Sequence, residues 1–215
     1  MAFEGGEVVS KLKKTGKAGP KETGTVVRAW PDGRYFDTAK IARRDMEMLL
    51  RAKAVLLPGL HVKLRDEAAK DEREWLYAGG LSAYLQERLE DAGGYVSPVF
   101  AGESYCAADD ATFAQGEGAS WAIAWAEAGG EGESFVNLIP TALGGTHEAG
   151  LRNAVYESIK EFCEHHELLT RGVSLQSEDA WKPLRYVLSA RILDPQFQGQ
   201  TKERLSSREA VKLVA

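Results

Sequence analysis

The sequence has few cysteines, no long apolar run and no excess of basic residues. Only Cys106 and Cys163 occur in 215 residues, far apart and outside any C-x-x-C pattern, so a reducing cytoplasm fits better than a disulfide scaffold. No run approaches the roughly 18 apolar residues that a membrane-spanning helix needs, and the N-terminus is too polar for a signal peptide. Lys and Arg total 27 against 32 Asp and Glu, and a net charge of -5 does not indicate a nucleic-acid protein, although it allows a local basic patch.

Several signatures of catalysis and metal binding are missing as well. There is no Walker A pattern, which excludes a P-loop nucleotide site. His147 and Glu148 have no second His four residues on, so they are not part of an H-E-x-x-H zinc site. The adjacent His165 and His166 face different sides of a helix and make a poor metal pair. We therefore predict neither a metal site nor a catalytic residue in this chain.

What is present is the composition of an ordinary globular protein, with 44% hydrophobic and 27% charged residues. Apolar spacing predicts helices over residues 44–57, 81–90 and from 146 onward, with Thr146 as N-cap, and residues 203–214 also have a helical pattern. Strands are predicted over residues 24–32, 61–65, 74–77, 96–105, 119–126, 133–139 and 186–193. The glycine-rich residues 129–132 predict a hairpin between two of these strands.

Residues 1–23 carry five lysines among glycines and a proline. We expect a solvated hairpin or loose arm here. The alternative is a patch that follows a phosphate backbone. It is less favoured, because no aromatic residue is interleaved with the lysines to stack on bases.

Residues 194–202 have the most distinctive chemistry in the chain. Pro195 ends the predicted strand because it has no N–H for a ladder, and Gly199 permits a tight turn. Residues 200–202, Gln-Thr-Lys, then bring a cation and two polar groups near one point, which suits an anionic ligand such as a phosphate. Spacing alone favours the alternative, a solvated loop lysine.

The run Asp-Pro-Gln-Phe-x-Gly-Gln-Thr-Lys resembles the QTK loop of the ATPase subunit of bacterial type IIA DNA topoisomerases. Residues 24–32 resemble the family's strand G-T-x-V-x-F-W-P-D, with Ala29 where an aromatic residue is usual. Residues 134–152, with Ser-Phe-Val-Asn-x-Ile-Pro-Thr and then Gly-Gly-Thr-His-Glu-x-Gly-Leu-Arg, resemble the family's signature segment. Residues 161–164 with residues 171–173, and residues 200–208, resemble the ATPase subunit of topoisomerase IV more than that of gyrase.

The resemblance implies an α+β fold with a mixed four-stranded sheet backed by helices, like the transducer domain related to ribosomal protein S5 domain 2. Residues 1–76 would form the C-terminal part of a GHKL ATPase domain, and residues 77–215 the transducer. Glu133 and Asn137 imitate the E-x-x-x-N box of such ATPases, but they lie on a predicted strand instead of a helix, so we treat the match as accidental. The resemblance covers the whole chain but only the middle of the family's subunit, so we expect a fragment that is inactive alone.

The resemblance also assigns roles to single residues. Lys202 and Gln200 would contact the γ-phosphate of ATP, and Thr25 would lie near the adenine. Arg152, at a Gly-x-Arg position, would line a DNA cavity between subunits, with an ordinary surface arginine as the alternative. The cofactors implied are ATP and, in the full subunit, Mg²⁺.

The function implied is that of an ATP-dependent isomerase that couples ATP binding and hydrolysis to DNA strand passage. The partners implied are DNA, the separate DNA-cleaving subunit in a heterotetramer, and a second copy through ATP-dependent homodimerisation. The alternatives are the equivalent part of the gyrase ATPase subunit, or a non-enzymatic interaction module without nucleotide dependence.

Overall fold

The computed structural model describes residues 1–38, 40–91, 96–127, 129–170 and 172–215, which divide into two compact units, Met1–Ala42 and Arg43–Ala215. The first unit contains one hairpin, β1 (Ala2–Glu4) and β2 (Glu7–Ser10), which turns at Gly5 and Gly6, both with positive φ. Its lysine-rich remainder is exposed. The domain boundary predicted after residue 76 falls within the second unit and stays a prediction.

The strand predicted over residues 24–32 is not formed. These residues have no regular secondary structure, and Val26, Val27 and Trp30 are 87%, 80% and 80% exposed. A strand needs a neighbour to pair its backbone groups and a second layer to cover its apolar face. Among the described residues of the first unit, neither is supplied, so the strand prediction was wrong here.

The second unit begins with α1 (Arg43–Leu56), the hairpin of β3 (Val62–Asp66) and β4 (Asp71–Trp75), and α2 (Gly80–Asp91). A mixed sheet follows in the order β5-β6-β9-β7-β8, made of β5 (Phe100–Tyr105), β6 (Gly118–Trp125), β7 (Gly132–Val136), β8 (Ile139–Pro140) and β9 (Leu184–Arg191). The other helices are α3 (Thr146–His165), α4 (Ser177–Trp181) and α5 (Ala210–Val214). The α+β class and the mixed sheet backed by helices are confirmed, with two-residue β8 as a fifth strand.

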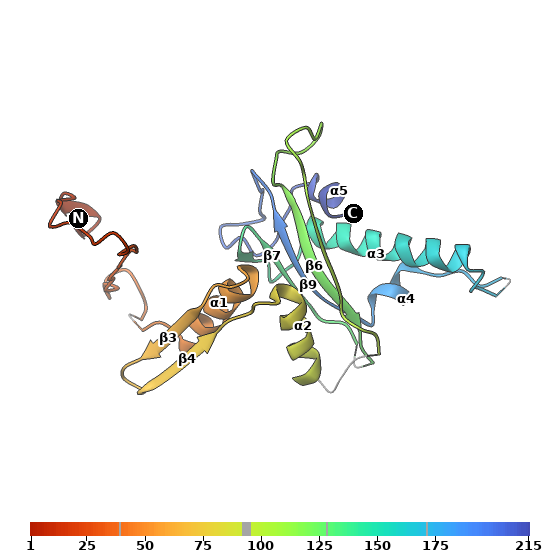
Figure 1. Cartoon of the computed structure of the whole chain (residues 1–215), viewed down its shortest axis with the longest axis horizontal. Helices are drawn as coiled ribbons and strands as arrows, with labels where there is room; N and C mark the ends of the chain where they lie inside the picture. Colours follow the sequence, from red (N-terminus) through yellow and green to blue (C-terminus); the bar gives the residue numbers. More distant parts are fainter. Residues whose placement is uncertain (39, 92–95, 128, 171) are drawn as a thin grey trace. The chain divides into compact units, whose positions relative to one another are not determined.

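Helices cover both faces of this sheet (Figure 1). Successive residues of a strand point to opposite faces, so Val187 and Leu188 on β9 enter different core layers. Val187 packs with Leu85 and Leu89 of α2, whereas Leu188 packs with Leu151 of α3. Burying a side chain of this size contributes about 1.5–3 kcal/mol. Two-sided burial explains why successive residues of β9, from Tyr186 to Leu188, are all apolar.

The hairpin predicted at residues 129–132 was wrong. The strands β6 and β7 do not pair, because β9 lies between them, antiparallel to β6 and parallel to β7. Glycines are a local signal, whereas the central place in a sheet goes to the strand that is apolar on both faces.

Among the described residues, no helix is long and apolar enough to cross a membrane.

Candidate functional site

Residues 196–206 leave β9 and turn back as a short two-stranded loop. Its stem (residues 196–198 and 204–206) is held by two backbone hydrogen bonds of 2.8 Å, from Gln198 N–H to Arg204 O and from Ser206 N–H to Gln196 O. Its tip (residues 199–203) is exposed. The helix predicted from residue 203 is therefore reduced to α5, because the stem uses the backbone groups that a helix would need.

The returning side of the stem is bonded to the residues that lead into α3. Leu143 N–H donates to Glu203 O at 2.9 Å, and Leu205 N–H donates to Gly144 O at 3.0 Å. Thr146 N–H donates to Leu205 O at 3.2 Å. The Leu205 side chain is 1% exposed and packs in a core cluster with Val136 and Ala190. The loop therefore has a buried, bonded base beneath an exposed tip.

Gln200 and Lys202 both lie on this exposed tip, and their contact with a phosphate stays a prediction. Lys202 has φ +58, a left-handed conformation that costs a residue with a Cβ about 1 kcal/mol. Its ammonium nitrogen lies 5.9 Å from the centre of the Phe197 ring. In the described part of the chain, no carboxylate forms an ion pair with it. The tip thus presents a cation and an amide to solvent.

Thr25 and Arg152 lie outside this loop. Thr25 is exposed in the first unit, and its place near an adenine stays a prediction. Arg152 of α3 forms an ion pair with Glu178, donates from Nε to Ser177 Oγ at 3.2 Å and lies over the Trp181 ring at 5.8 Å. These three contacts join α3 to α4, so Arg152 is more than an isolated surface arginine.

A buried chain of polar side chains fixes the residues before α3. Ser134 Oγ lies 2.6 Å from Thr141 Oγ1, which lies 3.1 Å from His147 Nε2. His147 is fully buried, and burial lowers its pKa to about 4, so its ring is neutral near pH 7. The N-cap of α3 is Gly145, with φ +145, which corrects the prediction of Thr146. Among the described residues, Thr146 Oγ1 and His147 Nδ1 have no hydrogen-bond partner.

Glu133 of β7 serves packing between elements. It accepts hydrogen bonds from the Tyr84 hydroxyl at 2.8 and 2.9 Å, and Arg88 lies 3.5 Å away. The pKa of Tyr84 is raised well above its usual value, mainly because the hydroxyl is buried and also because the Glu133 carboxylate lies beside it. The Arg51 guanidinium lies 5.0 Å from the centre of the Tyr84 ring. Glu133 therefore holds α2 to β7.

Among the described residues, no group of three or more His, Cys, Asp or Glu side chains is placed so that it could hold a metal ion.

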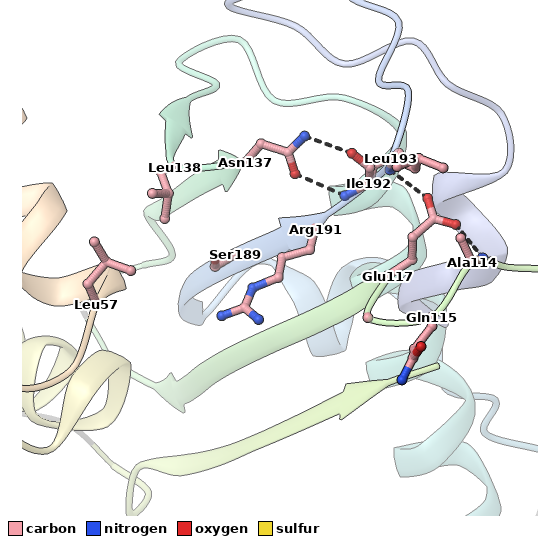
Figure 2. Close-up of a pocket in the computed structure, with 11 residues that line it drawn as sticks. Leu57, Ala114, Gln115, Glu117, Asn137, Leu138, Ser189, Arg191, Ile192 and Leu193 are labelled. Atoms are coloured by element: carbon pink, nitrogen blue, oxygen red, sulfur yellow. Dashed lines mark hydrogen bonds between the residues drawn. The ribbon is translucent and has the colours of Figure 1, made fainter. Parts of the chain in front are cut away.

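Two residues to which the sequence assigns no role hold the end of β9. Figure 2 shows Asn137, between β7 and β8, bonded to Ile192 by both ends of its amide, and Glu117 bonded to the backbone N–H of Leu193. They line a pocket of about 410 Å³. The sequence did offer one signal for a turn at this position, because asparagine favours the left-handed turns that join short strands.

Comparison with known proteins gives consistent matches. The sequence profile described as DNA gyrase B matches residues 80–215. The B subunit of DNA topoisomerase 4 from Pseudomonas aeruginosa is 44% identical over 217 residues, and the match covers 100% of this chain and 33% of that protein. The B subunit of DNA gyrase from Haloferax lucentense is 32% identical over 219 residues, with 99% and 33% covered. The topoisomerase IV ATP-binding domain of Francisella tularensis, solved with a small-molecule inhibitor, has a TM-score of 0.69 at 33% identity, covering 86% of this chain and 48% of that one.

The chain spans about a third of the length of the curated relatives it matches. The identity is higher to this topoisomerase 4 protein than to this gyrase protein, in agreement with the branch that residues 161–164 and 200–208 predict. The profile covers more than half of the chain, with the loop, α3 and the whole mixed sheet inside the matched region. The chain therefore belongs to the DNA gyrase B family.

Proposed function

We propose that this chain is part of the ATP-hydrolysing subunit of a type II DNA topoisomerase of the topoisomerase IV kind. Its role is to couple ATP binding and hydrolysis to DNA strand passage. The observation that carries the proposal is the loop at residues 196–206, which presents Lys202 and Gln200 on an exposed tip and is bonded at its base to the residues before α3. The relatives named as topoisomerase 4 B subunits support it.

The tip fits the terminal phosphate of a nucleoside triphosphate. Lys202 supplies a cation with no ion pair in the part of the chain that the structure describes, and Gln200 adds a neutral donor two residues away. A hydrogen bond to a charged group contributes about 1.5–3 kcal/mol. ADP lacks that phosphate, so the contact discriminates between the two nucleotides. Thr25 would lie near the adenine, and ligands for Mg²⁺ would come from elsewhere in the full subunit.

The base of the loop determines what such a contact can move. Glu203 and Leu205 are bonded to residues 143–146, so a displacement of the tip reaches α3 through backbone hydrogen bonds. A ligand shifts an equilibrium between two arrangements only by its differential affinity for them, which the γ-phosphate contact supplies. Without the rest of the subunit, no general base is assigned, and the chain alone is not expected to hydrolyse ATP.

The wider assembly follows from the same proposal. DNA would lie against α3, the separate DNA-cleaving subunit would complete a heterotetramer, and ATP would drive dimerisation of the full ATPase subunit. The setting proposed is a reducing cytoplasm, since Cys106 and Cys163 are both free thiols. None of these partners requires a basic chain overall, because DNA contact would be local to Arg152.

Lys202→Ala tests the proposal in a protein that includes the rest of the relatives' length. The affinity for a non-hydrolysable ATP analogue is expected to fall about 10-fold or more, because one charge-assisted hydrogen bond is lost. The affinity for ADP should stay nearly unchanged, and ATP turnover and strand passage should fall. Titration calorimetry with both nucleotides measures the difference.

The matched control is Lys212→Ala, which removes an exposed lysine from α5 and should change neither affinity. Equal losses for ATP analogue and ADP after Lys202→Ala, or no loss at all, would contradict the proposal. In the second case, the chain would be better explained as an interaction module without nucleotide dependence.

Arg152→Gln tests the DNA contact. In the full subunit we expect a smaller stimulation of the ATPase rate by DNA and a weaker salt dependence of that stimulation, because one phosphate contact is removed. Glu178→Gln is the informative partner variant, since it releases the Arg152 guanidinium from its ion pair and should strengthen the response to DNA. If Arg152 only joins α3 to α4, both variants will lower stability alike and leave the DNA response unchanged.

A further inference from the structure

Asn137 occupies a turn that few side chains accept. β7 ends at Val136 and β8 begins at Ile139, so Asn137 and Leu138 form the two-residue connection, with φ of +49 and +66. Two successive left-handed residues are typical of a type I′ turn, in which asparagine is preferred. The Leu138 carbonyl accepts a hydrogen bond of 2.5 Å from Lys53 Nζ of α1. The turn is therefore stabilised by the residue types that accept its backbone conformation and by the hydrogen bond from Lys53.

The Asn137 side chain continues the pairing of β7 with β9 beyond the last strand residue. Its backbone N–H donates to Ala190 O at 2.9 Å, the final backbone bond between these strands. Its amide then donates to Ile192 O at 2.7 Å and accepts from Ile192 N–H at 3.0 Å (Figure 2). In a parallel ladder, the N–H and C=O of Ile192 would bond two different residues of a longer β7, and the single Asn137 amide satisfies both groups instead. Ile192 is thus held as if β7 were longer.

Glu117 holds the next residue from the other side. Its carboxylate accepts from Leu193 N–H at 2.7 Å and from Ala114 N–H at 2.7 Å (Figure 2). The Leu193 side chain is 77% exposed, so packing does not hold it in place. Two side-chain contacts, one beside β6 and one beside β7, therefore fix the last residues before the loop.

We propose that Asn137 is a positioning residue for the tip residues Gln200 and Lys202. It sets the direction in which the chain leaves β9, shortly before the stem begins at Gln196. The stem itself stays paired through Gln198 and Gln196 and is held on its returning side by Leu205. Loss of the Asn137 contact therefore loosens the segment between β9 and the stem, and lets the tip shift over its base. This inference rests on the proposed function, because the tip matters only if Lys202 meets the terminal phosphate.

Asn137→Gly tests the contact, because glycine keeps the left-handed turn and removes the amide. In the 215-residue chain, hydrogen exchange at the backbone amide of Ile192 should become about 10-fold faster or more, since its N–H loses its acceptor. Exchange at Leu193, whose N–H donates to Glu117, should stay slow. Exchange within the middle of α3 should not change. Leu138→Gly is the matched control: it alters the same turn, leaves the amide in place and should leave exchange at Ile192 and Leu193 unchanged.

In the full subunit, Asn137→Gly should lower affinity for the ATP analogue more than for ADP, in the same direction as Lys202→Ala. The double variant should lose no more preference for ATP than Lys202→Ala alone, because both changes act through one contact. If Lys202→Ala separates the two nucleotides and Asn137→Gly does not, the positioning role is overturned and the proposed function stands. If neither variant separates them, both fail. Unchanged exchange at Ile192 would overturn the positioning role by itself.

Discussion

Replacing Gly145 with alanine is expected to lower the free energy of unfolding by about 3 kcal/mol or more. A Cβ at this position would lie 2.4 Å from Leu205 O and 2.7 Å from Leu205 N, and the backbone φ of +145 is one that residues with a Cβ rarely adopt. The atoms in the way belong to the backbone, so they cannot move without breaking the hydrogen bonds of Leu205 to Gly144 and Thr146. Urea denaturation of the 215-residue chain measures the loss.

Gly199→Ala is the matched control for this change. Gly199 lies in the tip of the same loop with φ +84, but no atom lies within 4 Å of the added Cβ. Only the conformational cost of about 1 kcal/mol should appear. If the two variants lose equal stability, the close approach of Gly145 to Leu205 does not contribute, and the description of a rigid loop base is wrong.

A second large effect is expected from pH, through His147. Its pKa in the folded chain is about 4, below the usual 6.5, because burial disfavours the charged ring. As pH falls from 6.5 toward 4, the unfolded chain takes up a proton that the folded chain does not, so the contribution present above pH 6.5 is progressively lost. The full difference corresponds to about 3 kcal/mol.

His147→Gln should remove this part of the pH dependence and keep a polar group facing Thr141. We would measure the free energy of unfolding by urea titration at several pH values between 7 and about 4.5. As the pH is lowered, this free energy should fall less steeply for His147→Gln than for the unaltered chain, because the carboxylates contribute equally in the two proteins. His165→Gln changes an exposed histidine near the end of α3 and should leave the slope unaltered. Parallel curves for the unaltered chain and His147→Gln would show that His147 does not titrate as its burial requires.

Local patterns predict the helices well and the strand pairing badly. The bounds of α1, α2 and the start of α3 agree with the apolar spacing within one or two residues, since every contact that sets this period lies within a few positions. The order of the sheet depends instead on which strand is apolar on both faces. The glycines at residues 129–132 therefore indicate a hairpin wrongly, because β9 separates the two strands.

The candidate site shows the same division. Gln200 and Lys202 are predicted from turn residues and from the resemblance of one continuous run, which is a local signal. The role of Asn137 is not predicted, because its partner Ile192 lies 55 positions away and nothing near Asn137 in the sequence indicates that pairing. The returning side of the stem likewise has a helical pattern in the sequence. The helix prediction fails there because the residues that bond this side, 143–146, lie far upstream and leave no local signal.

The central place of β9 also determines when this chain can fold during its synthesis. Until residues 184–191 leave the ribosome, the strands of the mixed sheet can form only two separate ladders, β5 with β6 and β7 with β8. The helices α2 and α3 are made earlier and have no completed sheet on which to bury their apolar faces. Pairings between distant segments form slowly, and exposed apolar faces favour aggregation meanwhile. We therefore expect the sheet and both core layers to form in one late step after β9 is made, and the loop base to follow once residues 203–206 are available.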